Sequence, residues 1–123
     1  MYKKHKKTEK TVPARIPGFG YWGGTGITPI GISYGEAHEE EEPKDPLHYR
    51  KKSRVYFIIL KGTLLLEIEG ERNECTNEIV YEIFPETPYR VLGSLKGECV
   101  WIAINTVNDP EDKVIVEKNG KEK

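Results

Sequence analysis

Two short stretches of this chain carry side chains suited to chemistry. The first begins with His48 and Arg50, and the second contains Tyr89. Residues two apart share a face if their stretch is a β-strand, because successive side chains of a strand point to opposite faces. An imidazole and a phenol each offer single oriented hydrogen bonds, while a guanidinium offers a planar fork that fits a carboxylate or a phosphate. These residue types suit the binding of a small polar molecule.

Other metal-binding side chains are few and poorly spaced. His5 lies in a lysine-rich segment, and His38 precedes the acidic run Glu39–Glu42. That run lacks the alternating oxygen ligands and the central glycine of a calcium loop. Cys75 and Cys99 are the only cysteines, and their spacing matches neither a zinc site nor a dense disulfide framework. We expect both cysteines to be free thiols.

The elements that position these residues have the pattern of short β-strands. Val55–Leu60 is an unbroken apolar run rich in β-branched and aromatic residues, which predicts a strand covered on both faces. Turn residues recur at roughly 8–12-residue spacing, a pattern typical of an all-β sandwich or barrel. We predict further strands at 30–34, 64–68, 79–83, 89–92, 100–104 and 114–116, with 69–73 as a hairpin connection.

Length and charge limit the class of protein. With 123 residues the chain suits one domain, which we divide into a flexible basic arm (1–12), a barrel that includes a Gly/Pro-rich N-terminal segment (13–116) and a flexible charged tail (117–123). A formal net charge of -1 gives no overall attraction to nucleic acid or anionic lipid. No apolar run approaches the ~18 residues that span a bilayer, and the N-terminus lacks the apolar stretch of a secretory signal. We expect a cytoplasmic protein without membrane contact. Binding of the basic arm to nucleic acid is the disfavoured alternative to a solubilising role.

Both chemical stretches resemble the signature motifs of cupins. His48-Tyr-Arg-Lys-Lys-Ser-Arg-Val-Tyr-Phe-Ile-Ile-Leu-Lys-Gly62 is similar to the first motif, G-x5-H-x-H-x(3,4)-E-x6-G. Ile83-Phe-Pro-Glu-Thr-Pro-Tyr-Arg90 is similar to the second motif, G-x5-P-x-G-x2-H-x3-N. The resemblance covers about residues 27–107. It implies an all-β fold, the cupin-type double-stranded β-helix or jelly-roll barrel, in a single domain.

The departures from these motifs fall on the metal ligands. The two histidines of the first motif correspond to His48 and Arg50, its glutamate to Val55 (Arg54 if a bulge intervenes), and the histidine of the second motif to Tyr89. These positions offer one imidazole, a cation without a lone pair, an aliphatic group and a phenol. The motif glycines correspond to Glu42, Gly62, Glu78 and Glu86, and the final asparagine to Gly93. We therefore predict no cofactor; a divalent metal is the disfavoured alternative, with His48 as its expected ligand.

The resemblance places His48, Arg50 and Tyr89 at one mouth of the barrel, with Tyr56 and Tyr81 as further candidates. We predict a cupin-domain protein that binds a small polar ligand there, either a carboxylate, a phosphate or a sugar-derived molecule, without the usual metal centre. In the alternative interpretation, Arg50 belongs to a solvated rim and the tyrosines pack in the core.

Two other functions stay open. One is a cupin enzyme, either isomerase- or epimerase-like on sugars through His48 with Tyr89 or Tyr81, or oxygenase-like with non-standard metal ligands. The other is a structural or regulatory module with a filled barrel. We also expect a homodimer in which the segment around Phe19–Trp22, or an edge strand, covers exposed sheet.

Overall fold

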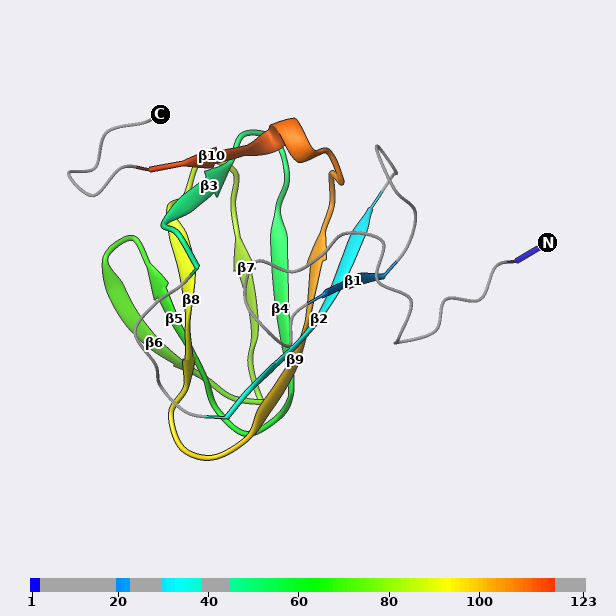
Figure 1. Ribbon diagram of the computed structural model, residues 1–123. Helices are drawn as coiled ribbons and strands as arrows, with labels where there is room; N and C mark the ends of the chain where they lie inside the picture. Colours follow the sequence, from blue (N-terminus) through cyan, green and yellow to red (C-terminus); the bar gives the residue numbers. More distant parts are fainter. Residues whose placement is uncertain (3–19, 23–29, 39–44, 117–123) are drawn as a thin grey trace.

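The computed structural model describes residues 1–2, 20–22, 30–38 and 45–116. Within these residues the chain forms ten β-strands and one short 3-10 segment, η1 (Pro110–Asp112) (Figure 1). One five-stranded sheet has the order β1 (Gly20–Trp22), β2 (Gly31–Ala37), β9 (Cys99–Asn105), β4 (Val55–Lys61) and β7 (Val80–Ile83). The other has the order β10 (Lys113–Ile115), β3 (His48–Arg50), β8 (Tyr89–Ser94), β5 (Leu64–Ile68) and β6 (Glu71–Cys75).

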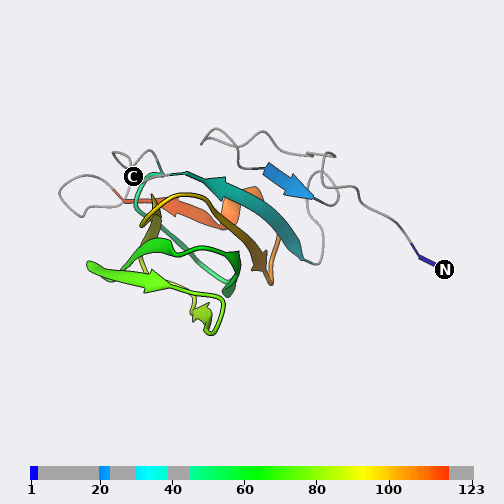
Figure 2. The same ribbon diagram turned by 90° about the horizontal axis from the view of Figure 1, so that it is seen from below.

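The chain passes back and forth between these sheets. From β2 to β10 every connection crosses from one sheet to the other, except the hairpin that joins β5 to β6. All the pairings are antiparallel, and most join strands that are far apart in the sequence. Figure 2 shows the β5–β6 hairpin on the opposite side of the molecule from β1 and β2. This is the topology of a jelly roll, and it confirms the all-β prediction.

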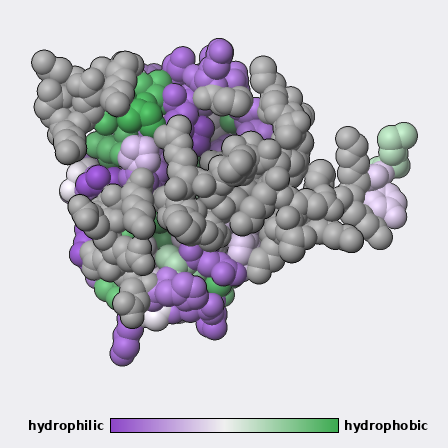
Figure 3. Space-filling view, viewed as in Figure 1, coloured by the Kyte–Doolittle hydropathy of each residue, from purple (hydrophilic) through white to green (hydrophobic). Residues whose placement is uncertain are grey.

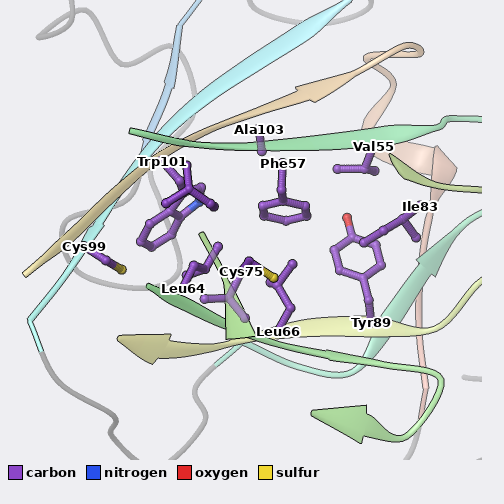
Figure 4. Close-up of a cluster of buried hydrophobic side chains, with 12 residues drawn as sticks. Val55, Phe57, Leu64, Leu66, Cys75, Ile83, Tyr89, Cys99, Trp101 and Ala103 are labelled. Carbon is purple, nitrogen blue, oxygen red and sulfur yellow. The ribbon is translucent and has the colours of Figure 1, made fainter. Parts of the chain in front are cut away.

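The core lies between the two sheets. Its buried members come from both layers: Val55, Phe57, Ile59, Leu64, Leu66, Cys75, Ile83, Tyr89, Val91, Cys99, Trp101 and Ala103 (Figure 4). Burial along β4 alternates, because Val55, Phe57 and Ile59 are buried whereas Tyr56 and Ile58 are half-buried and Leu60 is exposed. The strand is confirmed, but its outer face is only partly covered, less than the predicted cover on both faces implies.

The segment predicted as a hairpin connection contains a strand. Only Glu69 and Gly70 form the turn, with φ of 52° and 82°, the left-handed pair that suits a two-residue hairpin. Strand β6 begins at Glu71 and pairs with β5 along its length. It lies at the edge of its sheet and buries only Cys75, so its polar composition concealed it.

The remaining strand predictions are confirmed with ends shifted by at most three residues, while β1, β3 and η1 were not among the predicted elements. Most of the predicted basic arm and the charged tail lie outside the described residues, as do the acidic run Glu39–Glu42 and Phe19. Among the described residues there is no helix with the length and apolar character needed to cross a membrane.

Candidate functional site

The structure brings the imidazole of His48 and the phenol of Tyr89 together. They are direct partners across β3 and β8, although the sequence separates them by some forty residues. Their ring centroids are 4.4 Å apart, with the planes tilted by 55°. Both residues are buried, with exposed fractions of 3% and 4%, and Tyr89 also packs edge-on against Phe57. His48 and Tyr89 therefore form one contact on the inner side of the barrel.

Arg50 joins the two signature stretches. It lies two residues after His48 on β3, so its side chain leaves the strand on the same face, and its Nε is buried. Its carbonyl accepts a 2.7 Å hydrogen bond from the backbone N–H of Glu86, in the turn between β7 and β8. Glu86 occupies the glycine position of the second motif and has the left-handed φ of 66°.

The ring of His48 is oriented by the segment that precedes β3. Its Nδ1 lies 2.7 Å from the carbonyl oxygen of Pro46 and 3.8 Å from Oδ1 of Asp45. Because a carbonyl only accepts hydrogen bonds, this contact fits a ring whose Nδ1 is protonated and donates a hydrogen bond to Pro46. Sequence reasoning missed Asp45, and its only signal was the position three residues before His48, just ahead of a proline.

Tyr56 lies on the other face of its strand from the buried Phe57. Its hydroxyl donates a 2.7 Å hydrogen bond to Glu82, and the guanidinium of Arg54 donates one of 2.9 Å to the same carboxylate oxygen. The bond to Glu82 raises the pKa of Tyr56, and the two donated bonds lower the pKa of Glu82. Arg54 also stacks 4.6 Å from the centre of the Phe84 ring. This outer cluster is separate from His48 and Tyr89.

Tyr81 packs against the core opposite Phe57, and its interaction with Cys75 adds to the rise of its pKa. Burial raises the pKa of the Tyr81 hydroxyl and raises that of the Cys75 thiol to about 11. Cys99 is buried too, and its pKa is raised for the same reason. Both cysteines are free, as predicted.

The donor set does not fit the usual metal of this kind of barrel. Among the residues that the structure describes, no three His, Cys, Asp or Glu side chains gather where they could hold a metal ion. At the motif positions, Val55 is a buried aliphatic group and Arg50 has no lone pair to donate. These side chains therefore do not form the usual cupin metal site, and the lack of a cofactor stays a prediction.

No protein-family model matches the sequence, and no curated protein matches it significantly. Solved structures do match. A cupin protein from Bacteroides fragilis has 17% identity, a TM-score of 0.58, and coverage of 68% of this chain and 70% of its own. A double-stranded β-helix protein from Klebsiella pneumoniae has 11% identity, a TM-score of 0.67, and coverage of 96% and 100%. The chain has a cupin fold.

A third similar structure is Pac13 of Streptomyces, described as a nucleoside dehydratase. It has 12% identity and a TM-score of 0.67 over 95% of this chain and 92% of its own. Variants of Pac13 have been solved with uridine. At these identities the comparisons show the fold, while the roles of His48, Arg50 and Tyr89 stay predictions.

Position 62 can hold only glycine without strain. This residue closes the first motif in the turn between β4 and β5, with φ of 74°. A Cβ there would lie 2.3 Å from the carbonyl oxygen of Glu98, so backbone contact and conformation both require glycine.

Proposed function

We propose that this protein binds a small polar ligand, either a carboxylate, a phosphate or a sugar-derived molecule, without the metal centre that is usual in cupins. The proposed site consists of His48, Arg50 and Tyr89. The observation that carries the proposal is the contact between the His48 and Tyr89 rings at 4.4 Å, with Arg50 two residues further along the strand of His48.

The proposed site lies toward one end of the core, because side chains fill the space between the two sheets. In Figure 4, Phe57 lies in the middle of the cluster, Trp101 lies toward the end that contains Cys99, and Tyr89 lies toward the opposite end. At such a position a guanidinium binds an anionic or hydroxylated group in surroundings of low dielectric constant, where charge-assisted hydrogen bonds are strong. We leave Tyr56 out of the proposed site because it lies on the other face of its strand, and we keep Tyr81 as a packing neighbour.

The test is a ligand screen followed by calorimetry. Organic acids, phosphates, sugars and uridine are screened for thermal stabilisation; uridine is included because Pac13, which has a similar fold, has been solved with it. Arg50→Ala and Tyr89→Phe should each weaken binding of the best ligand by about tenfold or more, because one charge-assisted or buried hydrogen bond is worth roughly 1.5–3 kcal/mol.

Arg54→Ala is the matched control, since Arg54 is an arginine of the outer cluster. It should leave the affinity unchanged. Unaltered affinity in both Arg50→Ala and Tyr89→Phe would contradict the proposed site. If no compound stabilises the protein, the module with a filled barrel becomes the better interpretation, in agreement with the burial of Tyr89 in the core.

Metal-free acid–base catalysis on a sugar-type substrate is a second candidate function. The observation that favours it is the orientation of His48 by Pro46 beside the phenol of Tyr89. A positioned base that removes a proton and an acid that returns one are the requirements of an isomerase or epimerase. Deuterium uptake from solvent into a bound sugar, abolished in His48→Asn, would support this function. Binding without any exchange would rule it out for that ligand.

We also propose a homodimer in the cytoplasm. The segment expected at the interface, around Phe19–Trp22, is described only for the backbone of β1. The edge strand β7 is a second candidate, because Val80 and the preceding Ile79 are 59% and 49% exposed. Figure 3, viewed as Figure 1, shows hydrophobic side chains gathered at the upper left, where Figure 1 draws β10 and β3, so this area is distinct from the β7 edge. Light scattering should give twice the chain mass of 14.1 kDa, and the monomer mass would exclude the dimer.

A further inference from the structure

Asp45 fixes the segment that leads into β3 to the neighbouring strand β8. Its Oδ2 accepts a 2.7 Å hydrogen bond from the backbone N–H of Val91, two residues after Tyr89. Its Oδ1 lies 3.8 Å from Nδ1 of His48. The side chains of Asp45 and His48 are only 12% and 4% exposed. Asp45 therefore connects the approach to His48 with the strand that carries Tyr89.

The Pro46 carbonyl determines where the neutral His48 ring holds its proton. The 2.7 Å contact between Nδ1 and this carbonyl is a hydrogen bond only when Nδ1 is protonated. The carboxylate of Asp45 favours the same arrangement, because it attracts a proton on Nδ1 and repels a lone pair there. In the neutral ring the lone pair is then on Nε2.

We propose that Asp45 is a positioning residue for His48. Its hydrogen bond to Val91 holds the Asp45–Pro46 segment so that the Pro46 carbonyl keeps His48 in the Nδ1–H tautomer. In the neutral ring Nε2 is consequently the nitrogen that can accept a hydrogen bond.

The experiment reads the tautomer of His48 directly by NMR. Long-range ¹H–¹⁵N correlation spectra distinguish protonated from unprotonated ring nitrogens, and loss of signals in His48→Asn assigns His48 among the three histidines. At a pH where the ring is neutral, the unliganded protein should show a protonated Nδ1. In Asp45→Ala, the Nδ1 shift should move toward the unprotonated position. Asp45→Asn should retain the wild-type shift, since its amide oxygen can still accept from Val91.

Asp112→Asn is the matched control, because Asp112 is a second buried aspartate that accepts hydrogen bonds from backbone N–H groups. It should leave the His48 tautomer unchanged. An equal change in this control would overturn the specific role of Asp45, as would a folded Asp45→Ala protein with the wild-type tautomer.

Wild-type protein with the proton on Nε2 would overturn the proposal without any variant, so the test survives a failure of Asp45→Ala to fold. None of these spectra requires a ligand. Failure of the tautomer assignment is therefore distinguishable from failure of the binding function, which the Arg50→Ala affinity measures.

Discussion

The carboxylate of Asp112 holds the connection between β3 and β4 in place. It accepts hydrogen bonds of 2.8 Å from the N–H of Lys52 and 3.0 Å from the N–H of Ser53. The Ser53 hydroxyl continues this network by accepting a 3.2 Å bond from the N–H of Val107. Because Asp112 and Ser53 are buried, water cannot readily replace these partners. One side chain thus fixes the loop that follows Arg50.

Asp112→Ala should lower the free energy of unfolding by about 3 kcal/mol, because it leaves two backbone donors without their acceptor. Asp109→Ala is a suitable comparison. Asp109 caps η1 by accepting one hydrogen bond from the N–H of Glu111, and its replacement should lower the free energy of unfolding by only about 1 kcal/mol. Urea denaturation measures both. Equal losses in the two variants would show that the Asp112 network adds nothing beyond an ordinary cap.

Glu86→Gly should stabilise the protein by about 0.5 kcal/mol. A left-handed conformation costs an ordinary residue about 1–2 kcal/mol, and the greater freedom of glycine in the unfolded chain offsets part of the gain. The backbone bond from residue 86 to Arg50 is retained. Glu74→Gly, in the exposed part of β6, should destabilise instead. A loss of stability in Glu86→Gly would mean that its side chain contributes more than the strain removes.

Single residues were predicted from the sequence only where a motif marks them. The resemblance to the two motifs led us to expect His48 and Tyr89 at one mouth of the barrel, while their direct pairing came only from the structure. Asp45 could not be predicted, because its role depends on the pairing of β3 with β8, which lies far along the sequence. Tyr56 was proposed without regard to the alternation of its strand, which places it beside Glu82.

Among the strands, β2 and β9 form the longest ladder, with seven residue pairs from Gly31↔Asn105 to Ala37↔Cys99. Gly35 faces Trp101 in this ladder, and a Cβ on Gly35 would lie 2.3 Å from the indole ring. Trp101 is 3% exposed and belongs to the core cluster. The indole of Trp101 therefore packs in the space that a side chain at position 35 would occupy.

Gly35→Ala should cost about 2–3 kcal/mol, since the indole and its neighbours must shift to relieve the overlap. Thermal denaturation gives the loss, and the fluorescence of Trp101 should change with it. Gly70→Ala provides the contrast: no atom lies within 4 Å of its added Cβ, so only the strain at φ of 82° applies, about 1 kcal/mol. An unchanged melting temperature in Gly35→Ala would contradict the close contact.

Elements were predictable where burial gives them a pattern. The strands that contribute to the core contain β-branched or aromatic residues bounded by turns, and their positions followed from these features. Strand β6 is at an edge and mostly exposed, so neither apolar alternation nor burial marked it. Which strands pair, and in which register, depends on long-range contacts that no local pattern contains.

The whole molecule carries two buried thiols that link its stability to pH. The pKa of the Cys75 thiol is 9.0 for an exposed cysteine and about 11 in the folded protein, because burial disfavours the thiolate. The folded state thus retains a proton that the unfolded chain releases between these values. The contribution of the protonated Cys75 to the free energy of unfolding is fully present below pH 9 and decreases as the pH rises toward 11.

Between pH 9 and 11 the free energy of unfolding should fall by up to about 3 kcal/mol through Cys75 alone. Cys75→Ala should have a lower stability at pH 8 but a shallower decline above pH 9. Denaturation at a series of pH values measures both slopes. Parallel curves for the two proteins would assign the alkaline loss to other groups, such as Tyr81 and Cys99, whose pKa values are also raised.

The position of β3 in its sheet has a consequence for the order of events during synthesis. This three-residue strand pairs with β8 through a single residue pair and with β10 through three. A ribosome therefore completes the stretch that contains His48 long before it makes Lys113–Ile115, which supply most of the partners of that stretch. While the chain is still attached to the ribosome, the other sheet can assemble around β4 and β9. The strand that carries His48 then has its partner β8 but not yet its partner β10. If the proposed binding function holds, a nascent chain becomes able to bind a ligand only after β10 has been made.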